Sequence, residues 1–187
     1  MDIHKKILHD LLDSSYKRNK EAEMIGNVHG LKLDHELSNS ENKVFVDSDN
    51  NSHVVFTGTR KVGDLITDAS LLFGLQDYHP RFINSKKLIN KVKSKYNNIN
   101  AYGHSLGGRI AESVSDNVDN VITNNKAISK SDLFKKINSN QIDIRSGSDP
   151  ISFLGAYTQT GGKKKVIKNT NYLNPLKSHS YSNIKFL

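Results

Sequence analysis

The segment Gly103–Gly108 (GHSLGG) constrains the fold most, because it joins a β-type run to a helical pattern. The preceding residues Ile99–Tyr102 form a short run that is typical of a strand. From Leu106 onward, apolar residues recur at the spacing of one helical face. The sequence therefore predicts a strand, a sharp turn and a helix in direct succession, a unit from which parallel sheets are built.

A serine at the centre of such a turn is typical of a nucleophile elbow, in which the serine backbone has a positive φ. The residues two positions before and after the serine then crowd each other, so both must be small. Gly103 and Gly107 meet this requirement around Ser105. The N-terminus of the following helix presents unpaired N–H groups, and we expect the N–H of Leu106 to stabilise an oxyanion. The bare glycine pattern also arises by chance in loops, and the flanking strand and helix favour the elbow.

A nucleophilic serine needs a base and an acid, which follow such an elbow in the order Asp or Glu, then His. His179 is the candidate base, since it is the only histidine after the elbow. Taken alone, it is an ordinary surface histidine. Asp149 is the candidate acid, because it follows a predicted strand and ligand sites in open α/β sheets lie beyond the carboxyl ends of strands. Asp119 is the alternative acid, and a plain turn before Pro150 is the alternative explanation of Asp149.

The second oxyanion donor is expected in the loop after an earlier strand. Phe56–Arg60 (FTGTR) ends a predicted strand at a suitable place. Thr59 offers a backbone N–H and a hydroxyl, and Gly58 permits close approach of a substrate. A strand-ending turn without a catalytic role is the alternative interpretation.

The rest of the chain predicts an α/β fold with a mostly parallel sheet, an N-terminal antiparallel hairpin and helices on both faces. Two β-rich runs around a turn-forming segment predict the hairpin, at 43–46 and 53–57. Further strands are expected at 120–123 and 141–145, with a lysine-rich edge strand at 163–168. Helices are expected at 3–12, 64–73, 88–96 and 131–137.

The composition narrows the class of protein. A length of 187 residues favours one domain over 1–187. The chain has no cysteine, which excludes disulfides, thiolate metal sites and a catalytic cysteine, and the expected chemistry needs no cofactor or metal. The net charge of +8 favours transient contact with anionic membrane surfaces, and no nucleic-acid-binding motif accompanies it.

The first residues carry no signal-peptide pattern, and no apolar stretch has the length of a membrane span. We therefore expect a soluble protein in the cytoplasm or, if the gene is viral, in a virion. Abundant Lys and Asn with little Pro fit an AT-rich genome of viral, protist or bacterial origin.

From residue 40 to residue 187 the chain resembles the class 3 lipases, the fungal-lipase-like branch of the α/β-hydrolases. The motifs occur in the order of that family: the hairpin ending FTGT, an acidic segment at 64–68, the GHSLGG elbow, Asp149-Pro-Ile, and His179 with Tyr181. The resemblance implies a triad of Ser105, Asp149 and His179, and an oxyanion hole formed by Thr59 and Leu106. The chain departs from the family at Thr57, where arginine is common, and at Leu65, where tryptophan is usual.

The resemblance implies a carboxylic ester hydrolase that acts on lipids, a lipase or esterase, and the positive charge favours a phospholipase. In the family a lid follows the oxyanion strand, and residues 60–76 occupy that place. A core helix explains this segment equally well. A membrane-binding or structural module that keeps the fold with little turnover is the alternative function.

Overall fold

The computed structural model describes residues 5–59, 79–128, 132–150, 152, 158–167 and 174–186. Within these ranges one sheet contains β1 (Lys32–Leu33), β2 (Asn42–Val46), β3 (Ser52–Phe56), β4 (Ile99–His104), β5 (Asn120–Asn124), β6 (Lys136–Ser146) and β7 (Thr160–Ile167). The α-helices are α1 (Lys5–Ser15), α2 (Asn19–Val28), α4 (Pro80–Lys93), α5 (Leu106–Ser113) and α7 (Pro175–His179). Two short 3₁₀ helices, η3 (Ser115–Asn117) and η5 (Tyr181–Phe186), complete the description.

The strands lie in the order β1-β2-β3-β4-β5-β6-β7. The first three strands pair antiparallel, and every pair from β3 to β7 is parallel. The predicted hairpin is confirmed, with Val44 opposite Val54. The carboxyl ends of the parallel strands therefore meet at one edge, which is where the α/β class places its ligand sites.

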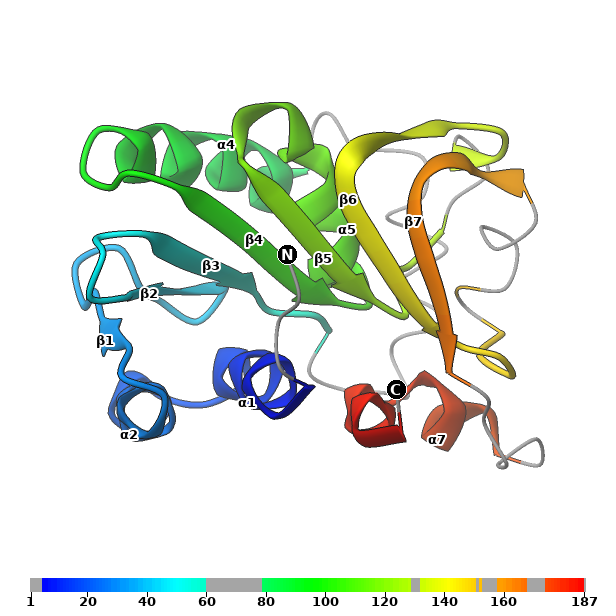
Figure 1. Ribbon diagram of the computed structural model, residues 1–187, viewed down its shortest axis with the longest axis horizontal. Coiled ribbons are helices and arrows are strands. Elements are labelled where there is room, and N and C mark those ends of the chain that lie inside the picture. The colour runs from blue at the N-terminus through cyan, green and yellow to red at the C-terminus, as the bar shows by residue number, and fades with distance from the viewer. Residues whose placement is uncertain are drawn as a thin grey trace.

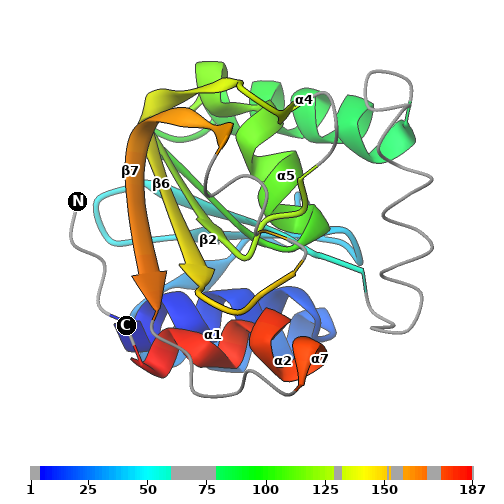
Figure 2. The ribbon, with the colours of Figure 1, turned by 90° about the vertical axis from the view of Figure 1, so that its right-hand side faces the viewer.

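Helices cover both faces of this sheet, as Figures 1 and 2 show. The green helices α4 and α5 lie on one face, and α1, α2 and the red C-terminal helices lie on the other. Each face buries its own apolar core. Phe56, Ile89 and Ile110 belong to the first core, and Leu8, Tyr102 and Ile184 belong to the second. The predicted fold class, a mostly parallel α/β sheet between two helical layers, is confirmed.

Most predicted elements are found, with some differences at their ends. Helix α4 ends at Lys93, so Tyr96 lies beyond the helix that was expected to contain it. The hydroxyl of Tyr96 donates to Asp34 Oδ2 at 2.6 Å, and the Tyr96 ring still packs on the core. The helix expected at 64–73 lies outside the described residues. Among those described, no helix is both long and apolar enough to cross a membrane.

The helix predicted at 131–137 is wrong. Lys136 and Ile137 already belong to β6, where they pair with Thr160 and Gly161 of β7. Phe134 has φ 66°, which a helix does not tolerate, and Asp132 is buried in an ion pair with Arg109 instead of capping a helix. The long pairing with β7 outweighs the local helical pattern.

Helix α2 was not predicted, because its sequence looks polar and irregular. Its buried residues are Ala22 and Gly26, while Met24 and Val28 are exposed. A Cβ on Gly26 would lie 2.7 Å from a ring carbon of Phe45, so the helix packs closely on β2 at this glycine. Helix α2 is held by the close approach of its backbone to β2 rather than by an apolar stripe, so the periodicity of apolar residues does not reveal it.

Candidate active site

Ser105 occupies the sharp turn between β4 and α5, with φ 56° and ψ −124°. A Cβ on Gly103 would overlap the backbone of Gly107, and a Cβ on Gly107 would overlap the carbonyl of Phe56. A Cβ on Gly108 would lie 2.9 Å from Lys126 Cβ. The strained φ of the serine and the need for small neighbours, both expected from the sequence, are therefore present in the structure.

Replacing Gly107 by alanine is expected to lower the free energy of unfolding by about 1–3 kcal/mol, because α5 must move away from β3 to make room. Urea denaturation measures this change. Gly147→Ala is the matched control, since its Cβ would meet only ordinary contacts, the nearest at 3.5 Å. Equal stabilities of the two variants would contradict the tight elbow.

Asp149 and His179 are in contact at the carboxyl edge of the sheet. His179 Nδ1 donates to Asp149 Oδ1 at 2.9 Å, and both side chains are almost fully buried. The other oxygen of Asp149 accepts from the backbone N–H and the hydroxyl of Ser152, at 3.1 and 2.5 Å. These bonds orient the carboxylate, and the carboxylate in turn orients the imidazole with its proton on Nδ1.

Ser105, the candidate nucleophile, and His179, the candidate base, each have one side-chain atom without a hydrogen-bond partner among the described residues. Ser105 Oγ and His179 Nε2 are buried, and neither makes a hydrogen bond within the described part of the chain. The ring of His179 lies 4.8 Å from that of His104, the residue before Ser105. The structure therefore shows no hydrogen bond between Ser105 Oγ and His179 Nε2, and proton abstraction would require these two atoms to approach each other.

The candidate oxyanion residues flank this region. Leu106 is the first residue of α5, so its N–H has no partner within the helix. A Cβ on Gly58 would lie 2.8 Å from the carbonyl oxygen of His104 and 3.5 Å from Ser105 Cβ. The segment that carries Thr59 therefore begins directly beside the serine.

The other downstream acids have structural roles away from the serine. Asp119 Oδ2 accepts from the N–H of Ile99, at the start of β4 and thus at the opposite edge of the sheet. Lys126, buried at 2% exposure, forms ion pairs with Glu112 and with Asp143, the latter at 2.7 Å. Within the described ranges no group of three His, Asp or Glu side chains is arranged to hold a metal ion.

The sequence did not reveal two residues that hold the candidate base and the candidate acid in place. Asn125 has φ 44°, and its side-chain amide donates to the carbonyls of Ser178 and His179 at 3.2 and 3.0 Å. Its Oδ1 accepts from the N–H of Ser146 at 2.7 Å. Ser152 holds Asp149 as described above. Asn after a strand tolerates a left-handed backbone, and a serine three residues after an aspartate often donates back to it, so both residues carry a weak local signal.

His104 is held neutral at the centre of the site. Burial, followed by the nearby His179, lowers the pKa of His104 from 6.5 to about 3. Its Nε2 lies 2.6 Å from the carbonyl oxygen of His179, which only accepts, so the proton is on Nε2. Nδ1 then accepts from the hydroxyl of Tyr16 at 3.0 Å.

This shift makes stability depend on pH. Below pH 6.5 the unfolded chain takes up a proton at His104 while the folded chain does not, so protonation favours unfolding. Between pH 6.5 and about 3, the free energy of unfolding should fall by about 1.4 kcal/mol per pH unit from this residue. Urea denaturation at several pH values, compared with His104→Gln, measures the contribution. Identical slopes for the two proteins would refute it.

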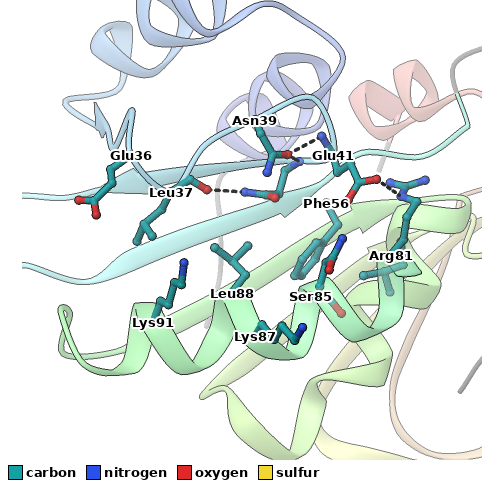
Figure 3. A pocket seen from close by; sticks show the side chains of 13 residues that line it. Glu36, Leu37, Asn39, Glu41, Phe56, Arg81, Ser85, Lys87, Leu88 and Lys91 are labelled. Atoms are coloured by element: carbon teal, nitrogen blue, oxygen red, sulfur yellow. Dashed lines mark hydrogen bonds and ion pairs between the residues drawn. The ribbon is translucent and has the colours of Figure 1, made fainter. Parts of the chain in front are cut away.

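A pocket of about 270 Å³ lies between α4 and the segment before β2 (Figure 3). Figure 3 shows Glu36 and Lys91 towards one end, with Glu41 and Arg81 towards the other. Leu37, Leu88, Phe56 and Ile110 are among the lining residues, whereas the serine, the aspartate and the histidine described above are not. Charged side chains of both signs line this pocket, and an acyl chain binds to apolar surfaces, so we do not assign the pocket to an acyl chain.

The sequence matches no protein-family model and no curated protein. Among solved structures it is similar to the Lip2 lipase from Yarrowia lipolytica, with a TM-score of 0.53 and 18% identity over 93% of this chain and 81% of that one. It is also similar to a fungal lipase in complex with an inhibitor, with a TM-score of 0.52 and 15% identity over 88% and 79% of the two chains. Identities this low show the fold and not the activity. The chain therefore has the α/β-hydrolase fold in its fungal-lipase-like form.

Proposed function

We propose that this protein is a serine ester hydrolase of the lipase or esterase type, with Ser105, Asp149 and His179 as its triad. One observation carries the proposal: the buried hydrogen bond from His179 Nδ1 to Asp149 Oδ1, beside an elbow serine with a positive φ. The catalytic unit is a single domain over residues 1–187, because α1 and the C-terminal segment cover the same face of the sheet.

The reaction follows from these positions. Asp149 holds the proton of His179 on Nδ1, which leaves the lone pair of Nε2 to accept the proton of Ser105 Oγ. The serine oxygen then bonds to the ester carbonyl, and the N–H of Leu106 with Thr59 stabilises the oxyanion. His179 passes the proton to the departing alcohol, and water releases the acid from the acyl-enzyme by the same steps in reverse roles. Residues of this chain perform each step.

A lipid ester is the substrate class we favour. Both of the structures named above are of lipases, and the second is the source of a model for interfacial activation in lipases. The net charge of +8 draws the protein towards anionic surfaces and favours phospholipid over neutral fat. Residues 60–76, for which the sequence left a lid and a core helix as equal alternatives, lie outside the described residues.

Hydrolysis of p-nitrophenyl esters of short and long acyl chains tests the proposal, followed by anionic and zwitterionic phospholipid vesicles. Covalent labelling by a fluorophosphonate, located by mass spectrometry, identifies the nucleophile. We expect hydrolysis and a label on Ser105, with faster turnover on anionic vesicles. Vesicle binding without hydrolysis or label would instead support the membrane-binding module.

A further inference from the structure

The C-terminal end of α1 reaches the candidate active site through Tyr16. The hydroxyl of Tyr16 donates to His104 Nδ1 at 3.0 Å, and His104 Nε2 donates to the carbonyl of His179 at 2.6 Å. These two bonds form a chain from α1 to the backbone of the proposed base. The ring of Tyr16 also stacks on that of Tyr181, with centroids 5.6 Å apart and planes at 12°.

The same end of α1 contacts the proposed oxyanion segment. Thr57 Oγ1 donates to the carbonyl of Ser15 at 2.8 Å, and both residues are buried. A Cβ on Gly58 would overlap the hydroxyl of Tyr16, so this hydroxyl lies against the backbone beside Thr59. One phenol oxygen thus touches the segment of the second oxyanion donor and the histidine that binds the base. Helix α1 lies outside residues 40–187, on which the sequence resemblance to lipases depends.

Burial of His104 favours its neutral form, which is the form that this chain of bonds requires. A protonated ring would carry a hydrogen on both nitrogens, so Nδ1 could no longer accept from the hydroxyl. Because the carbonyl of His179 takes the proton on Nε2, the hydroxyl of Tyr16 is the donor that suits Nδ1. The carbonyl of His179 therefore fixes the tautomer of His104, and the hydroxyl of Tyr16 binds the Nδ1 lone pair that this tautomer provides.

We infer that Tyr16 is a positioning residue of the active site, which acts through His104 to hold His179 and through Gly58 to hold the oxyanion segment. This inference depends on the proposed hydrolase function for its effect on turnover. On this inference the C-terminal end of α1 positions residues of the active site, in addition to packing on the sheet.

The test compares four variants of the full chain. Tyr16→Phe keeps the stacked ring and removes only the hydroxyl. We expect kcat to fall by about 10-fold to 100-fold with KM within about 2-fold, because small displacements of catalytic groups have effects of this size. Tyr96→Phe is the matched control, since it removes a hydroxyl bonded to Asp34 far from the site, and should keep the wild-type kcat. His104→Gln keeps a donor and an acceptor and should retain more activity than His104→Leu.

A spectroscopic readout separates this inference from the proposed function. In protein with ¹⁵N-labelled histidine, His104 should show a proton on Nε2 and a hydrogen-bonded Nδ1, and Tyr16→Phe should shift the Nδ1 resonance towards that of a free imine nitrogen. Unchanged kcat or an unmoved Nδ1 resonance would overturn the inference. If the wild type shows neither hydrolysis nor fluorophosphonate labelling, the proposed function fails, and the Nδ1 resonance alone then decides whether Tyr16 holds His104.

Discussion

Ser105→Ala is expected to lower kcat for ester hydrolysis by about 10⁶-fold, the largest effect of any substitution in this chain. In the proposed triad the three residues act as a unit, so without the serine oxygen neither His179 nor the proposed oxyanion donors would have an attacking group to assist. The side chain of Ser105 is buried, and its Oγ makes no hydrogen bond to another described residue, so alanine leaves no buried partner unpaired. Initial rates with a p-nitrophenyl ester, together with urea denaturation, measure the two consequences.

The serine variant should therefore keep its stability while it loses turnover. Ser94→Ala is a suitable control, because the exposed Ser94 hydroxyl donates only to the carbonyl of Lys91, at 2.8 Å. This control should match the wild type in rate. Residual turnover of Ser105→Ala above one per cent would show that another group attacks the ester, and the proposed nucleophile would then be wrong.

Asp149→Asn is expected to lower kcat by about 10⁴-fold with little change in KM. An amide at this position offers an N–H where His179 now finds an acceptor, and the imidazole is driven to carry its proton on Nε2. That nitrogen then has no lone pair with which to take the proton of Ser105. Steady-state kinetics with the ester substrate measure kcat and KM separately.

The control for this variant is a substitution of Asp119, the alternative acid from the sequence analysis. Asp119→Asn keeps an oxygen for the N–H of Ile99 and lies at the opposite edge of the sheet, so its kcat should stay within about 2-fold of the wild type. If Asp119→Asn lost activity and Asp149→Asn kept it, the assignment of the acid would be reversed.

Local chemistry made the elbow predictable. The positive φ of Ser105 and the close approach of Gly103, Gly107 and Phe56 restrict this turn to small residues, and the restriction is visible in the letters GHSLGG. Short β-rich runs likewise predicted the hairpin and most of the parallel strands, because the residues of a buried strand are mostly apolar or β-branched whatever its partners are. Helix α2 and the start of β6 were missed, since a close contact at Gly26 and pairing with β7 outweighed local preference there.

The sequence by itself thus determined the fold class and the place of the serine, because both depend on residues that are close neighbours in the chain. The chain order of the candidate partners is read directly from the sequence. Only the tertiary structure decided which acid contacts His179 and which residues hold the histidine in place. Tyr16 lies 88 residues from His104, and Asn125 lies 54 residues from His179. Contacts at such separations arise from how β4, β5 and α1 pack together, and no local pattern of residues encodes them.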